Sequence, residues 1–284
     1  MKISMKKMAS IIENALSEDI GSGDITTEAV ISDDRPAKGI IRAKQQGIIY
    51  GHKAARAVYN RLDNKTKYTA MAKDGSQVER GEIVAEIRAG MKTILTGERV
   101  ALDFLMHLSG IATLTNRFVS SVDGINVKIL DTRKTIPGLR LLEKAAVKAG
   151  GGENHRIGLF DMFMIKDNHI EAAGSIGNAI ERCLRWRGRK KTKIEVETKS
   201  LEEIEEALEY KIDRIMLDNM TPDQMAEAVQ FIRGKNPNVE IEASGNVSLG
   251  AVRRIANTGV DFISIGKLTH SAPSLDLSME IITL

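Results

Sequence analysis

Residues 193–219 read KIEVETKSLEEIEEALEYKIDRIMLDN, and this run indicates the fold class. The apolar segments 193–197 and 214–218 have the length of strands, and the segment 201–210 between them has the pattern of a helix. A strand, a helix and a second strand in so short a run predict two parallel strands. The run is therefore interpreted as one unit of an α/β protein.

The same unit repeats on both sides of this run. Strand candidates lie at 127–130, 162–165, 193–197, 214–218, 239–244 and 262–266. Further helical runs lie at 222–234 and 248–259. The spacing predicts parallel strands in a barrel that is short of the usual count of about eight. A doubly wound sheet is the alternative, although no GxGxxG follows the first strand.

The first 110 or so residues have a different pattern. A helix is expected at 8–20, short strands within 37–51 and 82–90, and a long amphipathic helix over 91–122. The segment 74–87, DGSQVERGEIVAEI, resembles a hairpin with Gly75 and Gly81 at its turns. This half is expected to form a separate α/β domain.

Composition excludes several classes of protein. The chain has 284 residues, with 41 basic and 38 acidic side chains and a net charge of +3, so we expect no nucleic-acid partner. The basic run RWRGRKK at 185–191 could contact a phosphate backbone, but a solvated surface loop is the better interpretation. No apolar stretch approaches the roughly 18 residues of a membrane span. A single cysteine, Cys183, indicates a reducing compartment, and we expect a cytoplasmic protein.

Polar residues follow the predicted strands, where the loops of a parallel α/β fold form the active site. Basic side chains there are Arg133, Lys134, Arg156 and Lys166, and we expect them to face Glu197 and Asp218 across the site. Such a site would bind an anionic small molecule on its basic side. Its carboxylates would hold Mg²⁺ or the hydroxyls of a sugar.

Each of these features also has a simpler explanation. A single strand-end Asp or Lys is more often a surface or capping group, and the segment 150–156, GGGENHR, could be only a flexible loop. Glu195 and Glu197 alternate along one strand, so both could point into the barrel while one merely pairs with a lysine. The functional interpretation depends on the conjunction of six strand ends that carry polar or glycine residues.

The amino-acid sequences of several segments resemble the motifs of one family. In order, the matching segments are EDIGSGDITT, GERVALDFLMHLSGIAT, DTRKTIPGLR, EKAAVKAGGGENHRIGLFDMFMIKDNHI, IEVET, IMLDN, EASGN and ISIGKLTHS. They resemble, over residues 18–275, the motifs of the quinolinate phosphoribosyltransferases. The sequence departs from the usual family pattern at Asp103, Met106, Ala146 and Asn246.

The resemblance implies a fold and an assembly. It implies an N-terminal α/β sandwich domain (1–112), an incomplete, six-stranded, open α/β barrel with the active site (113–270), and a C-terminal segment (271–284) that returns to the first domain. It also implies a homodimer, with higher assembly left open, in which the arginine of the GER motif, Arg99, reaches the partner's site.

The family's ligand-binding residues can be placed one by one. Those expected around the quinolinate carboxylates are Arg99, Thr132, Arg133, Lys134, His155, Arg156 and Lys166. Those expected near the ribose and Mg²⁺ are Glu195, Glu197 and Asp218, of which Glu197 and Asp218 would be the metal ligands. Those expected to hold the phosphate are Ser244, Gly245, Asn246, Ile265, Gly266 and Lys267. The catalytic role is expected of Lys134, Lys166, Glu197 and Asp218.

The implied reaction joins quinolinate to phosphoribosyl pyrophosphate and releases carbon dioxide and pyrophosphate, which gives nicotinate mononucleotide. Mg²⁺ is the implied cofactor. Three alternatives stay open: a related protein found with molybdenum-transport components, a nicotinate phosphoribosyltransferase, and a non-catalytic binding protein on the same scaffold. Lys166 argues against the first, and the dense basic cluster, which suits two carboxylates, argues against the second.

Overall fold

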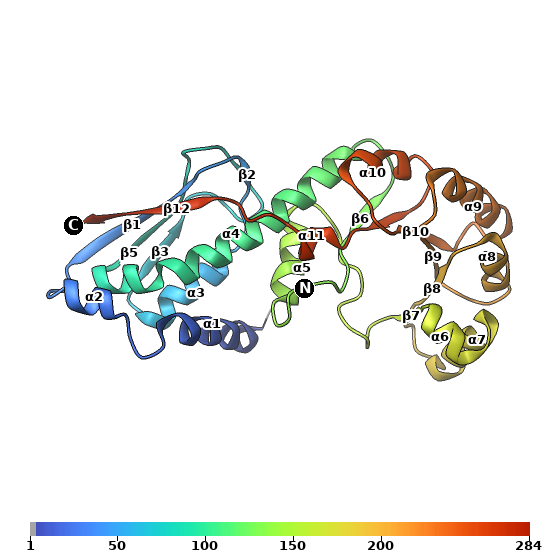
Figure 1. The fold of residues 1–284 in the computed structure, drawn as a ribbon, viewed down its shortest axis with the longest axis horizontal. Coiled ribbons are helices and arrows are strands. Elements are labelled where there is room, and N and C mark those ends of the chain that lie inside the picture. The colour runs from blue at the N-terminus through green and yellow to red at the C-terminus, as the bar shows by residue number, and fades with distance from the viewer. Residues whose placement is uncertain (1–3) are drawn as a thin grey trace. The chain divides into compact units, whose positions relative to one another are not determined.

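The computed structural model describes residues 4–284, so the first three residues of the predicted N-terminal domain lie outside the described residues. The chain forms two compact units (Figure 1). The first unit contains the described residues up to Asn116, together with Thr135–Gly151 and Leu268–Leu284. The second unit contains Arg117–Lys134 and Gly152–Lys267. No helix within residues 4–284 combines the length and the apolar character that a membrane span requires.

The second unit contains one six-stranded parallel sheet, with the strand order β6-β11-β10-β9-β8-β7. Its strands are β6 (Lys128–Leu130), β7 (Phe163–Ile165), β8 (Ile194–Thr198), β9 (Arg214–Asp218), β10 (Glu240–Ser244) and β11 (Phe262–Ser264). β6 and β7 lie at opposite ends of this order, so the sheet stays open. The six predicted strands and the open six-stranded architecture are therefore confirmed.

Five helices of this unit follow strands β7 to β10. They are α6 (Asp167–Ala173), α7 (Ile176–Arg187), α8 (Leu201–Leu208), α9 (Pro222–Lys235) and α10 (Leu249–Ala256), and α8, α9 and α10 lie outside the curved sheet (Figure 1). Their starting points follow from local chemistry. The side chain of Ser200 caps α8, and Thr221 and Gln224 form a reciprocal capping box ahead of α9.

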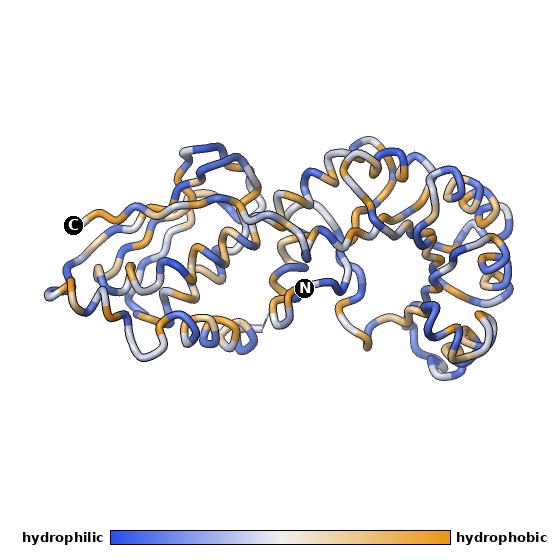
Figure 2. The backbone as a smooth tube through the Cα atoms, viewed as in Figure 1, coloured by the Kyte–Doolittle hydropathy of each residue, from blue (hydrophilic) through white to orange (hydrophobic). Residues whose placement is uncertain are grey.

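Alternation along the strands gives this sheet two different faces. On β8, Ile194 and Val196 are fully buried among apolar neighbours, whereas Glu195 and Glu197 point to the opposite face. The same period places Arg214 on β9 and Glu242 on β10 on that polar face, because β8, β9 and β10 are in parallel register. Figure 2 shows hydrophilic and hydrophobic residues mixed along these strands. The inside of the open barrel is therefore charged.

The first unit is a layer of helices on an antiparallel sheet with the strand order β12-β1-β5-β3. The strands are β1 (Pro36–Ala43), β3 (Lys67–Ala70), β5 (Ile83–Gly90) and β12 (Leu277–Thr283). The helices are α1 (Met5–Ile20), α2 (Ile25–Val30), α3 (His52–Leu62), α5 (Arg140–Ala149) and the first part of α4 (Met91–Ser121), and the short α11 (Lys267–His270) begins at the edge of the unit. The C-terminal strand β12 pairs with β1, so the end of the chain completes this sheet.

Gly97, the glycine of the GER motif, lies where α4 packs against α3. A Cβ at this position would lie 2.8 Å from the ring of Tyr59 on α3. Tyr59 is fully buried, so its ring could not move aside easily. The glycine of the motif therefore allows α4 and α3 to pack closely.

One local prediction was wrong. Gly75 and Gly81 adopt positive φ values of 87° and 90°, as turn glycines should. The strands around them do not form a hairpin, because β4 (Gln77–Val78) pairs with β2 (Gly47–Ile48), while β5 belongs to the four-stranded sheet. Pairing with a segment 30 residues upstream is a long-range contact that the local pattern does not encode.

Candidate active site

The candidate site is built on the carboxyl ends of the parallel strands of the second unit. Because the strands are parallel, residues that end them lie at the same edge of the sheet. Every predicted site residue except Arg99 belongs to this unit. The structure therefore supports the predicted grouping of these residues within one unit.

The rim of the site contains an ion pair between neighbouring strands. Nζ of Lys166, which follows β7, contacts Oε2 of Glu197 on β8. The Lys166 side chain is 41% exposed and that of Glu197 is 9% exposed. The sequence had placed these two residues on opposite sides of the site, whereas the structure joins them directly. Because Lys166 is partly exposed to solvent, its Nζ can move from Glu197 to the carboxylate of a ligand.

Asp131 fixes the loop that carries His155 and Arg156. This buried aspartate directly follows β6, and its Oδ1 accepts a hydrogen bond from the backbone N–H of His155 at 2.9 Å. Its Oδ2 accepts another from the side-chain amide of Asn154 at 2.6 Å. Residue Glu153 also forms a β-bridge with Leu130. The loop is therefore held in place and is not merely a flexible connection.

Cationic side chains gather next to this loop. Burial, and then the charge of Arg133, lower the pKa of the Arg156 guanidinium. Nη1 of Arg156 donates to the carbonyl oxygen of Met162 at 3.2 Å. Oγ1 of Thr132 accepts from the backbone N–H of Lys134 at 3.0 Å, which shapes the turn after β6. Arg133 thus lies near enough to Arg156 for its charge to act on it, and both belong to the basic cluster that the sequence predicted.

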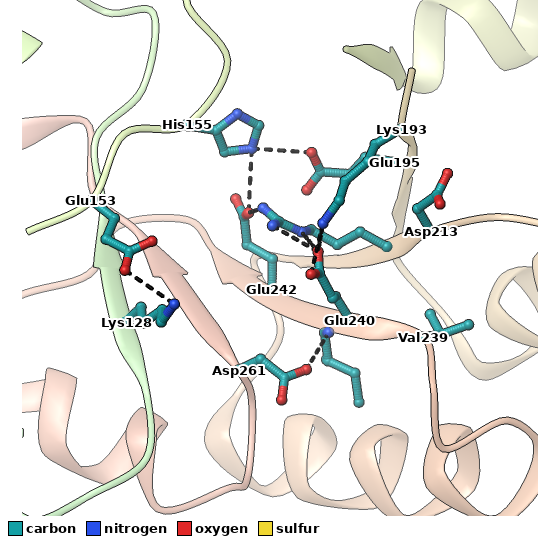
Figure 3. A network of polar contacts seen from close by, with 12 residues as sticks. Lys128, Glu153, His155, Lys193, Glu195, Asp213, Val239, Glu240, Glu242 and Asp261 are labelled. Atoms are coloured by element: carbon teal, nitrogen blue, oxygen red, sulfur yellow. Dashed lines mark hydrogen bonds and ion pairs between the residues drawn. The ribbon is translucent and has the colours of Figure 1, made fainter. Parts of the chain in front are cut away.

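A charged cluster joins His155 to two glutamates of neighbouring elements (Figure 3). The Nε2 atom of His155 is 3.0 Å from Oε2 of Glu195 and 3.3 Å from Oε2 of Glu242. Burial opposes a charge on the ring, but hydrogen bonds to the two glutamates outweigh it and raise the pKa of His155. Burial, and then the charge of Glu242, raise the pKa of Glu195 to about 7.

The pKa of Glu242 is shifted in the opposite direction from that of Glu195. Burial alone would oppose its charge, but His155 and Arg214 hold the pKa of Glu242 below its ordinary value. Nη1 of Arg214 donates to Oε2 of Glu242 at 2.7 Å. Glu195 is 0% exposed, and its closest charged neighbour in this cluster is His155. A direct contact between Glu195 and a substrate stays a prediction.

The loops after β9 and β10 contain residues with a left-handed backbone, and the backbone N–H of Asn219 donates to the carbonyl oxygen of Ser244 at 2.9 Å. Asn219 and Asn246 have positive φ values of 56° and 45°, and Gly245 has a φ of 105°. A Cβ on Gly245 would lie 2.2 Å from Oδ1 of Asn219, so only glycine fits there. Of these residues, only Gly245 and Asn246 are successive, and such a turn can direct backbone N–H groups at an anion.

The structure places the other predicted residues as follows. The backbone N–H of Ile265, which is buried, donates to the carbonyl oxygen of Leu130 at 2.9 Å, and Gly266 and Lys267 follow at the same edge of the sheet. Asp218, at the end of β9, accepts a hydrogen bond from the side-chain amide of Asn219 at 2.8 Å. Ser244 is half-buried at the end of β10.

Arg99 is the exception, because it lies on α4 in the first unit. Its Nη1 contacts Oδ1 of Asp103, one helical turn away, at 3.3 Å, and both side chains are about 60% exposed. With Asp103, His107 and Ile136 it lines a pocket of about 370 Å³ within this unit. The family departure at Asp103 therefore provides Arg99 with a partner on its own helix.

Two residues of the site, Arg214 and Glu242, were missed by the prediction from sequence. Asp131 and Asn219 were recognised as strand-end residues but were given no role. The pattern of β10, EIEAS, contained a signal for Glu242, because it repeats the alternation that pointed to Glu195 and Glu197 on β8. No comparable signal existed for the positive φ of Asn219.

The fold and the site define a class of protein: an open α/β barrel with basic and acidic side chains at the carboxyl ends of its strands. Family models for the N-terminal and C-terminal domains of quinolinate phosphoribosyl transferase match residues 24–109 and 111–280. The chain therefore belongs to the quinolinate phosphoribosyltransferase family.

Individual relatives agree over nearly the whole chain. A protein of Synechocystis sp. called probable nicotinate-nucleotide pyrophosphorylase (carboxylating) is 45% identical, over 95% of this chain and 91% of the relative. A protein of Bacillus subtilis with the same name is 41% identical, over 97% and 93%. The structure of the nicotinate-nucleotide pyrophosphorylase from Francisella tularensis superposes with a TM-score of 0.93 at 38% identity, covering 99% of this chain and 98% of that one.

Proposed function

We propose that this protein transfers the phosphoribosyl group of phosphoribosyl pyrophosphate to quinolinate and releases carbon dioxide, giving nicotinate mononucleotide and pyrophosphate. One observation carries the proposal within the family. The cations Arg133, Arg156 and Lys166 lie at strand ends of one unit, beside the carboxylates Glu197 and Asp218. A ligand with two carboxylates next to a ribose and a pyrophosphate matches this distribution of charge.

The basic residues would bind and orient quinolinate. Arg133 and Arg156 suit one carboxylate because a guanidinium can donate two parallel hydrogen bonds. Lys166 would leave Glu197 and contact the second carboxylate. Holding the ring nitrogen next to C1 of the ribose converts an encounter of two molecules into a reaction within one complex.

The reaction itself asks for charge stabilisation more than for a strong acid or base. Bonding to the ribose turns the ring nitrogen into a pyridinium, whose positive charge stabilises the electron pair left on the adjacent ring carbon when its carboxylate departs as carbon dioxide. A proton from solvent then completes the C–H bond at that carbon. Lys134 and Lys166 would stabilise negative charge on the substrates as it shifts. Glu197 and Asp218 would face the positive charge that develops on the ribose.

Glu197 and Asp218 also fit a magnesium ion. Both are carboxylates at the ends of neighbouring parallel strands, and Mg²⁺ prefers such hard oxygen ligands. When bound with phosphoribosyl pyrophosphate, Mg²⁺ would neutralise charge on the pyrophosphate leaving group. Ser244, Gly245, Asn246, Ile265, Gly266 and Lys267 would hold the phosphate of the ribose, with Gly245 allowing close approach of the backbone.

The test is an assay with quinolinate that carries a labelled carboxyl group next to the ring nitrogen. We expect release of labelled carbon dioxide that requires phosphoribosyl pyrophosphate and equals the nicotinate mononucleotide formed. Turnover of nicotinate in place of quinolinate would favour a nicotinate phosphoribosyltransferase. Binding of quinolinate without any turnover would favour a non-catalytic protein and contradict the proposal.

We also propose a homodimer in which Arg99 completes the site of the partner. Support comes from the family pattern and from the fact that Arg99 belongs to the first unit, whereas the other predicted site residues belong to the second. A two-fold dimer makes such an exchange reciprocal. The single cysteine, Cys183, is consistent with a cytoplasmic location, which belongs to the same proposal.

Mixing two inactive variants tests this exchange. Arg99→Ala lacks the donated cation, and Lys166→Ala has a defective barrel site but can still donate Arg99. Random exchange of subunits should restore about a quarter of the activity, because half the dimers are mixed and each contains one intact site. A mixture that stays inactive although its subunits demonstrably exchange would place the action of Arg99 within its own chain, or remove its role.

A further inference from the structure

A set of buried charges in the second unit has no role in the reaction described above. Arg214 is 7% exposed, and Glu242 is fully buried. Nη1 of Arg214 donates to Glu242 at 2.7 Å, while its Nε and Nη2 donate to Oε2 of Glu240 at 3.1 and 2.9 Å. Apolar residues of similar volume are often at least as stabilising as such a buried charge network. The network therefore calls for an explanation other than stability.

The contacts of Glu242 lead to the substrate-binding loop. Its Oε2 faces Nε2 of His155 at 3.3 Å (Figure 3), and Nδ1 of the same ring accepts the backbone N–H of Arg156 at 2.7 Å. The two ring nitrogens therefore have different neighbours, with Nδ1 facing the backbone of Arg156 and Nε2 facing the two glutamates. The ring of His155 thus links the buried carboxylates to the backbone of Arg156.

A metal ion is the main alternative for this cluster. The ligand atoms of His155, Glu195 and Glu242 all lie within 4.8 Å of one another, a spacing that also suits a metal site. The guanidinium of Arg214 already donates to Oε2 of Glu242, the oxygen that faces the histidine. That cation compensates the carboxylate in the place where a metal would have to bind, so the geometry favours a hydrogen-bonded network.

We infer that Glu242 is a positioning residue of the quinolinate site, held by Arg214 and acting through the ring of His155 on the backbone of Arg156. The inference rests on the proposed function and deepens it. With Glu242 in place, the ring stays in one orientation, and the backbone that carries the Arg156 guanidinium stays fixed. Asp131 fixes the same loop from the other side through the backbone N–H of His155.

The chain offers a matched control on the same strand. Glu240 and Glu242 both accept hydrogen bonds from Arg214, but only Glu242 faces His155. Glu240→Gln therefore weakens two of the three bonds that Arg214 makes to these carboxylates while leaving His155 untouched. A purely structural role of the network would make Glu240→Gln and Glu242→Gln similar. A positioning role would separate them.

The experiment measures KM for quinolinate and for phosphoribosyl pyrophosphate in the wild type, Glu242→Gln and Glu240→Gln. Glu242→Gln should raise KM for quinolinate roughly tenfold, the effect of one hydrogen bond to a charged group. KM for phosphoribosyl pyrophosphate should change less than about twofold, because that substrate lies on the other side of the site. Glu240→Gln should leave both constants near the wild-type values. Removing a negative charge by itself would strengthen the binding of a dianion, so weaker binding indicates lost position and not lost charge.

The outcomes distinguish the inference from the function on which it rests. A wild type without turnover would refute the proposed function. An active wild type with equal quinolinate KM in the wild type and Glu242→Gln would refute the inference alone. If Glu242→Gln does not fold, Glu242→Asp keeps the charge, withdraws it from His155, and should show the same selective rise in KM.

Two further measurements complete the test. In a His155→Ala background, Glu242→Gln should have no additional effect on KM for quinolinate, because the ring that transmits its effect is absent. An unchanged additional effect would mean that Glu242 acts by another route. Stoichiometric zinc in the purified wild type that Glu242→Gln loses would overturn the inference in favour of a metal site.

Discussion

Glu195 and Glu197 lie two residues apart on β8 and point to the same face, yet their surroundings differ. Glu197 is at the rim and pairs with Lys166, whose side chain is 41% exposed. Glu195 lies one layer deeper, is fully buried, and contacts His155. The same residue type on the same strand thus belongs to two different layers of one charged barrel.

This difference separates residues that can bind a ligand from residues that hold the site in shape. A rim pair next to solvent can open and give its lysine to a ligand, because water can replace the lost contacts. An interior pair cannot open without leaving a buried charge unpaired, which is costly. We therefore expect rim residues to determine activity and interior residues to determine geometry and stability. The following predictions test this division, from the largest effect to the smallest.

Lys166→Ala should have the largest effect on activity. The variant removes the rim cation expected to bind a quinolinate carboxylate, and kcat/KM for quinolinate should fall roughly a hundredfold, near the upper limit for one charged hydrogen bond. The melting temperature should change little because the side chain is half-exposed. Lys199→Ala is the control, since Lys199 is also ion-paired, with Asp167, in the next loop. Near-normal activity of Lys166→Ala would remove the residue from the site.

Asp218→Asn should change the metal requirement. Losing one carboxylate ligand should raise the Mg²⁺ concentration for half-maximal activity on the order of tenfold, with KM for quinolinate unchanged. Asp223→Asn, at the exposed start of α9, provides the control. An unchanged Mg²⁺ dependence with weaker quinolinate binding would mean that the basic and acidic sides of the rim have been exchanged.

Glu195→Gln, in the interior layer, should change how the melting temperature depends on pH. The pKa of Glu195 is raised to about 7 in the folded protein, so the folded state keeps a proton that the unfolded state loses near 4.5. The stability from this proton is fully present below pH 4.5 and is lost as the pH rises through 7. Glutamine cannot ionise, so the melting temperature of the variant relative to the wild type should rise across this window.

The size of this effect is on the order of 2–3 kcal/mol between the two ends of the window. Thermal unfolding of both proteins at pH 4.5, 6 and 8 measures it. Parallel curves for the variant and the wild type would show that Glu195 does not titrate in this range.

Asp103→Asn should have the smallest effect on stability. The pair that Asp103 forms with Arg99 is exposed and spans one helical turn, so its loss should cost less than about 0.5 kcal/mol. The variant frees Arg99 from its neighbour, and KM for quinolinate should stay the same or fall slightly. A marked rise in KM would mean that Asp103 itself holds Arg99 in its working position.

The sequence predicted those parts of the fold and of the candidate site that follow a regular pattern along the chain. The six strands and α4 could be recognised from their periodicity, and the strand ends located the rim, since parallel strands bring their ends together. The alternation of Glu195 and Glu197 correctly placed both on the inner face. Such patterns depend only on residues that are close together in the sequence, so the sequence alone is enough to recognise them.

Contacts between distant segments could not be predicted in the same way. The pairing of β4 with β2 and the membership of Thr135–Gly151 in the first unit depend on packing across the chain. The pairing of Lys166 with Glu197 depends on the side-by-side placement of β7 and β8, which the spacing alone does not give. The partners of His155 come from three different strands or loops for the same reason.

A structure of the protein with quinolinate bound tests the division into two layers most directly. We expect Nζ of Lys166 to have left Glu197 and to lie within hydrogen-bonding distance of a quinolinate carboxylate. The contacts of His155 with Glu195 and Glu242 should keep their present distances of 3.0 and 3.3 Å. An intact pair between Lys166 and Glu197, with quinolinate bound elsewhere or with the ring of His155 turned away from Glu242, would contradict the account.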